Sequence, residues 1–115
     1  MSGERFGTFV RREREAKGIG LREMAKMIGV SPTYLSKVER DEFSPPVEDK
    51  VKAIAKIINC DPDELLARAG RVSSDISDII KRHPAELAAL LRTTRSFTVK
   101  DIAQLAQQAQ RAKDK

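Results

Sequence analysis

Several residue types that build cross-links or reactive sites are nearly absent from this chain. Its 115 residues include one cysteine (Cys60), one histidine (His83) and no tryptophan, and aromatic side chains make up only 4%. A single cysteine excludes an intramolecular disulfide, and with a single histidine it excludes a zinc site built from Cys and His. No Ser/His/Asp or Cys/His arrangement, paired-carboxylate site or phosphate-binding glycine loop stands out. We therefore expect no cofactor, no metal and no enzyme activity.

Long apolar runs are also missing. No run approaches the ~18 residues of a membrane-spanning helix, and the charged N-terminus has no stretch of signal-peptide type. The hydrophobic fraction is nevertheless 40%, which is enough for a small core. We expect a cytoplasmic chain with no membrane partner, of a length that allows one domain or one small domain with an appendage.

Charge is unevenly distributed along the chain. The 22 basic and 17 acidic residues give a formal net charge of +5. Residues 1–40 and 71–115 each carry nine basic and five acidic side chains, whereas residues 41–70 carry four basic and seven acidic ones. A basic excess is weak support for binding to nucleic acid, because a solvated surface alone can produce it.

Apolar residues recur at helical spacing, and no segment alternates as a strand would. Ser31-Pro32 and Asp61-Pro62 mark two helix starts, because the first residue caps the helix and proline suits its first position. We predict helices over residues 5–17, 21–28, 31–40 and 47–58, and a short one from Asp61-Pro62 to near Ala69. The residues expected to face the core are Phe6, Phe9, Val10, Ala16, Leu21, Met24, Ala25, Ile28, Leu35, Val38, Val51, Ile54, Ala55 and Ile58. The sequence thus predicts an all-α fold with a compact five-helix domain over residues 1–70.

Beyond Gly70 the helical pattern continues but loosens. Segments 73–82 and 84–95 and a last helix capped by Thr98 are expected, with residues 110–115 fraying. They carry more apolar surface than a lone tail can hide, at Ile76, Ile79, Ile80, Leu87, Leu90, Leu91, Ile102 and Leu105. We interpret residues 71–115 as a helical extension for dimerisation. Binding of a partner protein and folding back onto the first domain remain alternatives.

The most informative stretch is residues 21–40, LREMAKMIGVSPTYLSKVER. Ala25 is small where a second helix must cross, and Gly29 allows the positive φ that reverses the chain. Two short helices joined by a turn containing glycine form a helix-turn-helix. The apolar wedge that fixes the angle between them comprises Met24, Ile28, Val30, Leu35 and Val38.

Because of these residues, the segment 5–70 resembles the Xre family, the helix-turn-helix domains of lambda Cro and repressor type. The resemblance implies a five-helix DNA-binding domain of a transcriptional regulator that is usually a homodimer. It also implies a structural ion pair between Arg14, late in the first helix, and Glu39, at the end of the recognition helix. Gly20 and Leu21 depart from the family pattern, which has a capping hydroxyl and a glutamine there.

Docking geometry in such domains places the recognition helix, residues 31–40, in the major groove. The base-reading residues are then expected to be Pro32, Thr33, Ser36 and Lys37, with Lys37 the best direct reader because lysine donates to guanine O6 and N7. The residues expected to contact phosphates are Arg22, Lys26, Ser31, Tyr34 and Arg40. Alternatively, Ser31 only caps the helix, Tyr34 only packs, and Arg22 and Lys26 are only solvated. The acids expected to oppose the DNA backbone are Asp41, Glu42, Glu48 and Asp49.

The sequence therefore favours a sequence-specific transcriptional regulator, a repressor that binds double-stranded DNA as a homodimer at an inverted repeat. The alternative is an antitoxin-type or protease-switched regulator whose C-terminal segment binds a toxin or protease partner. Cys60 is expected to be a small buried hydrophobe, and His83 a helix-start residue.

Overall fold

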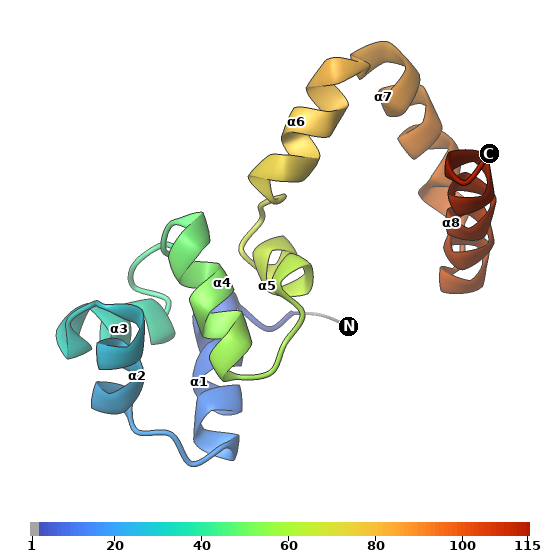
Figure 1. Ribbon diagram of the computed structural model, residues 1–115. Coiled ribbons are helices and arrows are strands. Elements are labelled where there is room, and N and C mark those ends of the chain that lie inside the picture. The colour runs from blue at the N-terminus through green and yellow to red at the C-terminus, as the bar shows by residue number, and fades with distance from the viewer. Residues whose placement is uncertain (1–2) are drawn as a thin grey trace. The chain divides into compact units, whose positions relative to one another are not determined.

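The computed structural model describes residues 3–115, which are mostly helical, and no strand occurs within that range (Figure 1). The expected all-α fold class is confirmed. The chain divides into two compact units, unit 1 up to Ser74 and unit 2 over Asp75–Lys115. The helices are α1 Phe6–Ala16, α2 Leu21–Ile28, α3 Pro32–Glu39, α4 Glu48–Ile57, α5 Pro62–Arg68, α6 Ser74–Arg82, α7 Pro84–Thr93 and α8 Val99–Lys113, with a 3-10 turn at Thr94–Ser96.

The capping residues predicted from sequence begin their helices as expected. The Ser31 hydroxyl accepts a hydrogen bond from the Tyr34 amide at 3.0 Å, with Pro32 at the first helical position. Asp61 in the same way accepts from the Asp63 amide at 2.8 Å, and Thr98 from the Asp101 amide at 3.1 Å. Each of these side chains satisfies an amide that has no partner inside its helix.

Unit 1 contains every fully buried apolar side chain of residues 3–115. Within it α3 packs against α1 and α2, α2 against α4, and α4 against α5. Most residues expected in the core are buried there. The core comprises Phe6, Phe9, Val10, Met24, Ala25, Ile28, Leu35, Val38, Val51, Ile54, Ala55, Ile58, Leu65 and Leu66.

Three expectations of the sequence are wrong. Ala16 is exposed rather than inward-facing, because it lies off the face of α1 that carries the buried residues Val10 and Arg14. Cys60 is half-buried, although burial does raise the pKa of its thiol. Residues 110–113, expected to fray, are helical, because α8 extends to Lys113.

Helix α1 approaches α3 so closely that only glycine fits at position 7. Gly7 is buried, and a Cβ atom built on it would lie 2.0 Å from the carbonyl oxygen of Val38. Carbon and oxygen atoms in contact need more than 3 Å, so a side chain at position 7 would force the two backbones apart. Gly7 is required here for its small size, since it lies inside a regular helix.

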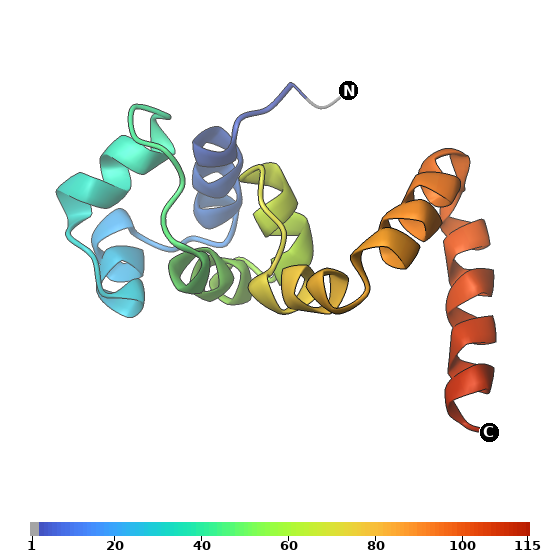
Figure 2. The same cartoon turned by 90° about the horizontal axis from the view of Figure 1, so that it is seen from above.

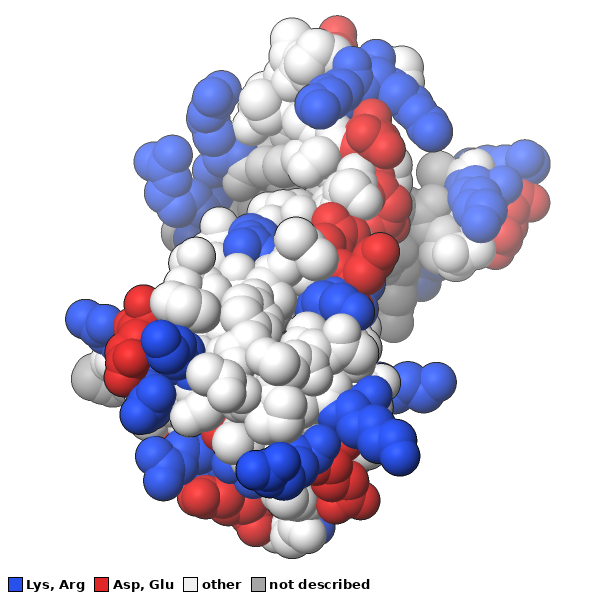
Figure 3. Space-filling model, turned by 90° about the vertical axis from the view of Figure 1, so that its left-hand side faces the viewer, with Lys and Arg blue, Asp and Glu red and all other residues white. Residues whose placement is uncertain are grey.

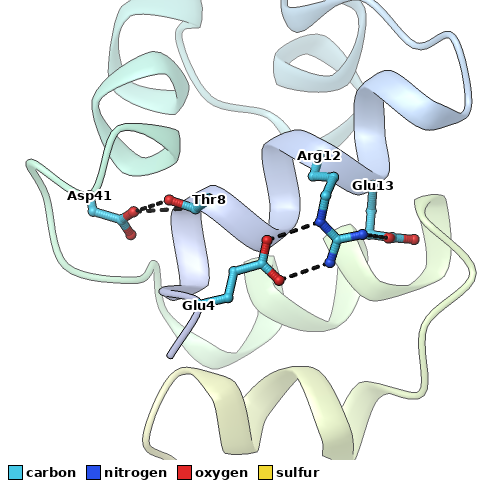
Figure 4. Close-up of polar contacts among 5 residues, drawn as sticks. All are labelled: Glu4, Thr8, Arg12, Glu13 and Asp41. Atoms are coloured by element: carbon cyan, nitrogen blue, oxygen red, sulfur yellow. Dashed lines mark hydrogen bonds and ion pairs between the residues drawn. The ribbon is translucent and has the colours of Figure 1, made fainter. Parts of the chain in front are cut away.

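Asp41, in the loop after α3, caps the first turn of α1. The N-cap residue of α1, Arg5, makes no side-chain capping bond. Asp41 supplies the missing acceptors: its carboxylate accepts from the Gly7 amide at 2.8 Å, the Thr8 amide at 3.2 Å and the Thr8 hydroxyl at 2.8 Å. Figure 4 shows the contact with Thr8. A negative charge at a helix N-terminus also interacts favourably with the helix dipole.

The backbone of Asp41 is itself unusual. Its φ is +60°, a conformation that costs most residues energy and that glycine usually adopts after a helix. The amides of Asp41 and Glu42 donate to the carbonyls of Val38 and Lys37 at 3.0 and 2.9 Å, which is the Schellman pattern of helix termination. The backbone amide of Asp41 therefore donates to a carbonyl at the end of α3, and its side chain accepts hydrogen bonds from amides at the start of α1.

A second group of contacts fixes the start of α1. The guanidinium of Arg12 bridges Glu4 and Glu13, with N–O distances of 2.8 Å to each (Figure 4). Hydrogen bonding to Glu4 raises the pKa of Arg12, and the same bond lowers the pKa of Glu4. The chain before α1 is thereby held against the outer face of that helix.

Replacing Gly7 by alanine tests the close approach. Gly7→Ala is expected to lower the free energy of unfolding by about 1–3 kcal/mol, the usual range for overpacking, even though alanine favours a helix more than glycine does. Urea denaturation followed by circular dichroism measures this change. Gly3→Ala is the matched control, because a Cβ there meets nothing within 4 Å. A Gly7→Ala protein as stable as the parent would contradict the constraint.

Candidate nucleic-acid interface

Helices α2 and α3 lie together at one side of unit 1 (Figures 1 and 2). A shallow groove runs between the start of α2 and the outward face of α3. The residues that line it are Leu21, Arg22, Pro32, Thr33, Ser36 and Arg40. The structure thus brings together, from two helices, three of the four residues predicted to read bases and two of those predicted to contact phosphates.

The predicted residues differ in exposure. Thr33, Arg22, Lys26, Ser31 and Arg40 are exposed. Pro32, Ser36, Lys37 and Tyr34 are half-buried, so each presents part of its surface. Ser31 makes the capping bond described above, and its hydroxyl hydrogen can still be donated outward. All nine predicted side chains therefore reach the surface of α2 or α3.

Lys37 lies outside the groove and has an aromatic neighbour for which the sequence pattern gave no sign. Its Nζ lies 5.2 Å from the centroid of the Phe43 ring. The Phe43 ring in turn lies 5.9 Å from the Tyr34 ring, at an interplanar angle of 45°. Tyr34 also packs against the core, so it has the packing role that was one of its two interpretations. A contact of its hydroxyl with phosphate stays a prediction.

The acidic residues after α3 have partners within unit 1. The Asp41 carboxylate is held by the start of α1, and Glu42 lies 3.2 Å from the Arg40 guanidinium. The expectation that both acids oppose a DNA backbone stays a prediction, now with these partners known. The charge of Asp41 is balanced by amides and a helix dipole, and Glu42 offsets part of the charge of Arg40.

Two residues of α4 also have internal roles. The Lys50 ammonium donates to the carbonyl of Ile28 at 2.6 Å, so it caps the end of α2. Glu48 accepts bonds from Ser74 and pairs with Lys52 at 2.8 Å. Hydrogen bonding to Lys52 and Ser74 lowers the pKa of Glu48 to about 2. The contacts of Lys50 and Glu48 therefore stabilise unit 1, and both side chains already have partners within it.

Arg14 and Glu39 connect α3 to α1. Two guanidinium nitrogens of Arg14 each donate to one carboxylate oxygen of Glu39 at 2.8 Å. Both residues are buried, at 7% and 4% exposure, and Arg14 also donates to the carbonyl of Ile19 at 2.7 Å. The hydrogen bond to Glu39 raises the pKa of Arg14. This two-point contact fixes the orientation of α3 as well as its distance from α1.

Charge on this side of the molecule is mixed. Viewed from the side of α2 and α3, both Lys or Arg side chains and Asp or Glu side chains border a largely uncharged area (Figure 3). Lys and Arg are the side chains that most often contact phosphates in protein–DNA interfaces. The part of the chain that the structure describes has no cluster of three His, Cys, Asp or Glu residues suited to a metal, and no helix there could cross a membrane.

Comparison with known proteins agrees with this geometry. The helix-turn-helix family profile matches residues 10–65. The chain is 34% identical over 61 residues to the "ImmF control region 10 kDa protein" of Bacillus phage phi105, covering 53% of this chain and 67% of that one. The chain belongs to the helix-turn-helix family of lambda-repressor type. The DNA-binding domain of the P22 c2 repressor has the same fold, with a TM-score of 0.51 and 33% identity over 57% of this chain and 86% of that one.

A longer relative shows how far the likeness extends. An uncharacterized HTH-type transcriptional regulator of Mycobacterium tuberculosis is 39% identical over 64 residues, 56% of this chain. This chain's match spans 45% of that relative's length, which is about half. This relative is named a transcriptional regulator, and the P22 protein is named a repressor.

Removing one member of the buried ion pair tests its structural role. Arg14→Met is expected to lower the free energy of unfolding by about 3–5 kcal/mol, because it leaves the Glu39 carboxylate buried and unpaired. The double variant Arg14→Met/Glu39→Met is expected to regain most of that loss, although the Ile19 carbonyl still lacks its donor. Thermal and urea unfolding measure both variants. Equal stability of the single variant and the parent would show that the pair does not hold α3.

Proposed function

We propose that this protein is a cytoplasmic, DNA-binding transcriptional repressor that acts as a homodimer on an inverted repeat. The groove between α2 and α3 carries the proposal, since it gathers donors for bases and for phosphates around a helix whose orientation is fixed by the Arg14–Glu39 pair. Helix α3 would enter the major groove with its first turns against the base edges.

The residues would divide into two sets. Pro32, Thr33, Ser36 and Lys37 would face base edges, with Lys37 donating to guanine and Thr33 offering a hydroxyl or a methyl group. The residues that would contact phosphates and so set the register are Arg22, Lys26, Ser31, Tyr34 and Arg40. This division follows from position on α3 and α2 and from exposure.

Homodimerisation is supported by the composition of unit 2. Its helices bury no side chain within unit 2. Large apolar residues are exposed there, at Ile76, Ile79, Leu90, Leu91, Phe97, Val99 and Ile102. Such surface is characteristic of an interface. A two-fold dimer would place its recognition helices about 34 Å apart, one DNA turn, which calls for an inverted repeat with that spacing.

The same apolar surface supports a second candidate, in which unit 2 binds a toxin or protease partner and thereby switches the regulator. The two candidates differ in the state of the purified protein. A homodimer forms without any other component, whereas a partner-binding extension leaves the purified chain monomeric.

Substitution of two basic residues tests the division of roles. Lys37→Ala is expected to reduce discrimination at one base pair of the operator by roughly five- to hundredfold, because a good bidentate contact is lost. Arg22→Ala is expected to weaken binding to all duplexes alike and to make binding less dependent on salt. Duplexes selected from a random library, followed by titration at several salt concentrations, measure both effects. Lys56 is an exposed lysine of α4, and Lys56→Ala controls for the loss of one positive charge. If Lys37→Ala and Arg22→Ala both weakened binding to every duplex by the same factor, the division of roles would be refuted.

Truncation tests the proposed dimer. A chain ending at Ser74 keeps every residue of the core, so it is expected to fold and to be monomeric. The full chain is expected to have twice its sequence mass of 12.8 kDa. Light scattering over a range of concentrations measures both masses. A truncated chain that still forms dimers would refute dimerisation through unit 2, and a monomeric full chain would refute the homodimer.

A further inference from the structure

The loop after α3 places an aromatic ring beside the lysine that is proposed to read a base. The Nζ of Lys37 lies 5.2 Å from the Phe43 ring centroid, within the ~6 Å over which a ring face attracts a cation. The Phe43 side chain is 44% exposed. Burial in the core therefore does not account for a phenylalanine at this position.

The ring is held in place from two directions. The Phe43 amide donates to the carbonyl of Lys37 at 3.3 Å, so the loop folds back over the last turn of α3. The Tyr34 ring, itself packed against the core, supports the Phe43 ring at 5.9 Å between centroids. The position of Phe43 relative to Lys37 is thus set by α3 and its terminating turn.

The acids next to Lys37 in the sequence are engaged elsewhere. Asp41 is occupied by the start of α1, and Glu42 lies beside Arg40. Lys37 forms no ion pair with any of the residues that the structure describes, 3–115. An ion pair would occupy the donors of the ammonium group and would have to break before DNA bound, whereas a ring face attracts the charge and leaves the N–H groups free.

We propose that Phe43 is a positioning residue for Lys37, and that it sharpens sequence specificity by restricting the lysine side chain before DNA arrives. Ordering a long flexible side chain opposes binding, so restricting it in advance favours the contact that needs it. This inference rests on the proposed base-reading role of Lys37. Phe43 itself needs no contact with DNA.

The test measures discrimination, defined as the ratio of Kd values for two duplexes. One duplex is the site that the full chain selects from a random library. The other differs only at the base pair whose discrimination Lys37→Ala abolishes. Phe43→Leu, which keeps apolar bulk and removes the ring, is expected to lower this ratio about two- to fivefold, the effect of an exposed cation–π contact. Phe43→Tyr, which keeps the ring, is expected to retain the parent ratio.

A double-mutant cycle separates this role from a merely structural one. In a Lys37→Ala background, Phe43→Leu is expected to change the ratio no further, because the residue it positions is gone. Tyr34→Leu, which removes the supporting ring, is expected to shift the ratio in the same direction as Phe43→Leu. Tyr34→Phe keeps that ring but removes the hydroxyl proposed to contact a phosphate, so it is expected to weaken binding to both duplexes alike and to keep the parent ratio.

The outcomes distinguish this inference from the function on which it rests. If Lys37→Ala changes discrimination but Phe43→Leu leaves the ratio unchanged, or weakens both duplexes equally, the positioning role is refuted and the proposed function stands. If Lys37→Ala changes discrimination at no base pair, the base-reading role of Lys37 fails and the positioning role fails with it.

Discussion

The orientation of the recognition helix depends on the buried pair between Arg14 and Glu39. A surface helix of eight residues buries little on its own, so its direction must come from contacts with its neighbours. The Arg14–Glu39 pair acts at the last turn of α1, and Gly7 and Asp41 act at its first turn. On α3 these contacts all lie at its C-terminal end, at Val38 and Glu39 and in the following loop at Asp41, and they join that end to both ends of α1.

Much of this fold could be predicted from local sequence, but the contacts that hold α3 could not. Helix starts can be predicted at Ser31, Asp61 and Thr98, because a capping side chain accepts a hydrogen bond from an amide within three residues of it. The contact between Asp41 and Gly7 joins residues 34 positions apart, and no local pattern encodes it. Arg14 and Glu39 were paired only through the family resemblance, since a buried arginine and an exposed one look alike in sequence.

In the candidate site, too, local features could be predicted from the sequence and long-range contacts could not. Helical periodicity predicted which residues of α2 and α3 reach the surface, because the helix period fixes the face of each. The association of Lys37 with Phe43 was missed, because it depends on how the chain turns after α3. Net charge was the weakest guide. Arg11, Arg12, Arg14 and Arg40 are all paired with acids inside unit 1, and the net charge does not show which basic side chains are left for a partner.

The placement of the contacts that hold α3 bears on how this domain can change over evolution. On the side of α3 these contacts use a backbone carbonyl of Val38, the buried side chain of Glu39 and the loop residue Asp41. The outward residues Pro32, Thr33 and Ser36 take no part in them. Substitutions at the outward positions therefore leave the contacts that hold α3 intact, and under the proposed function related proteins can change their operators while keeping the same scaffold.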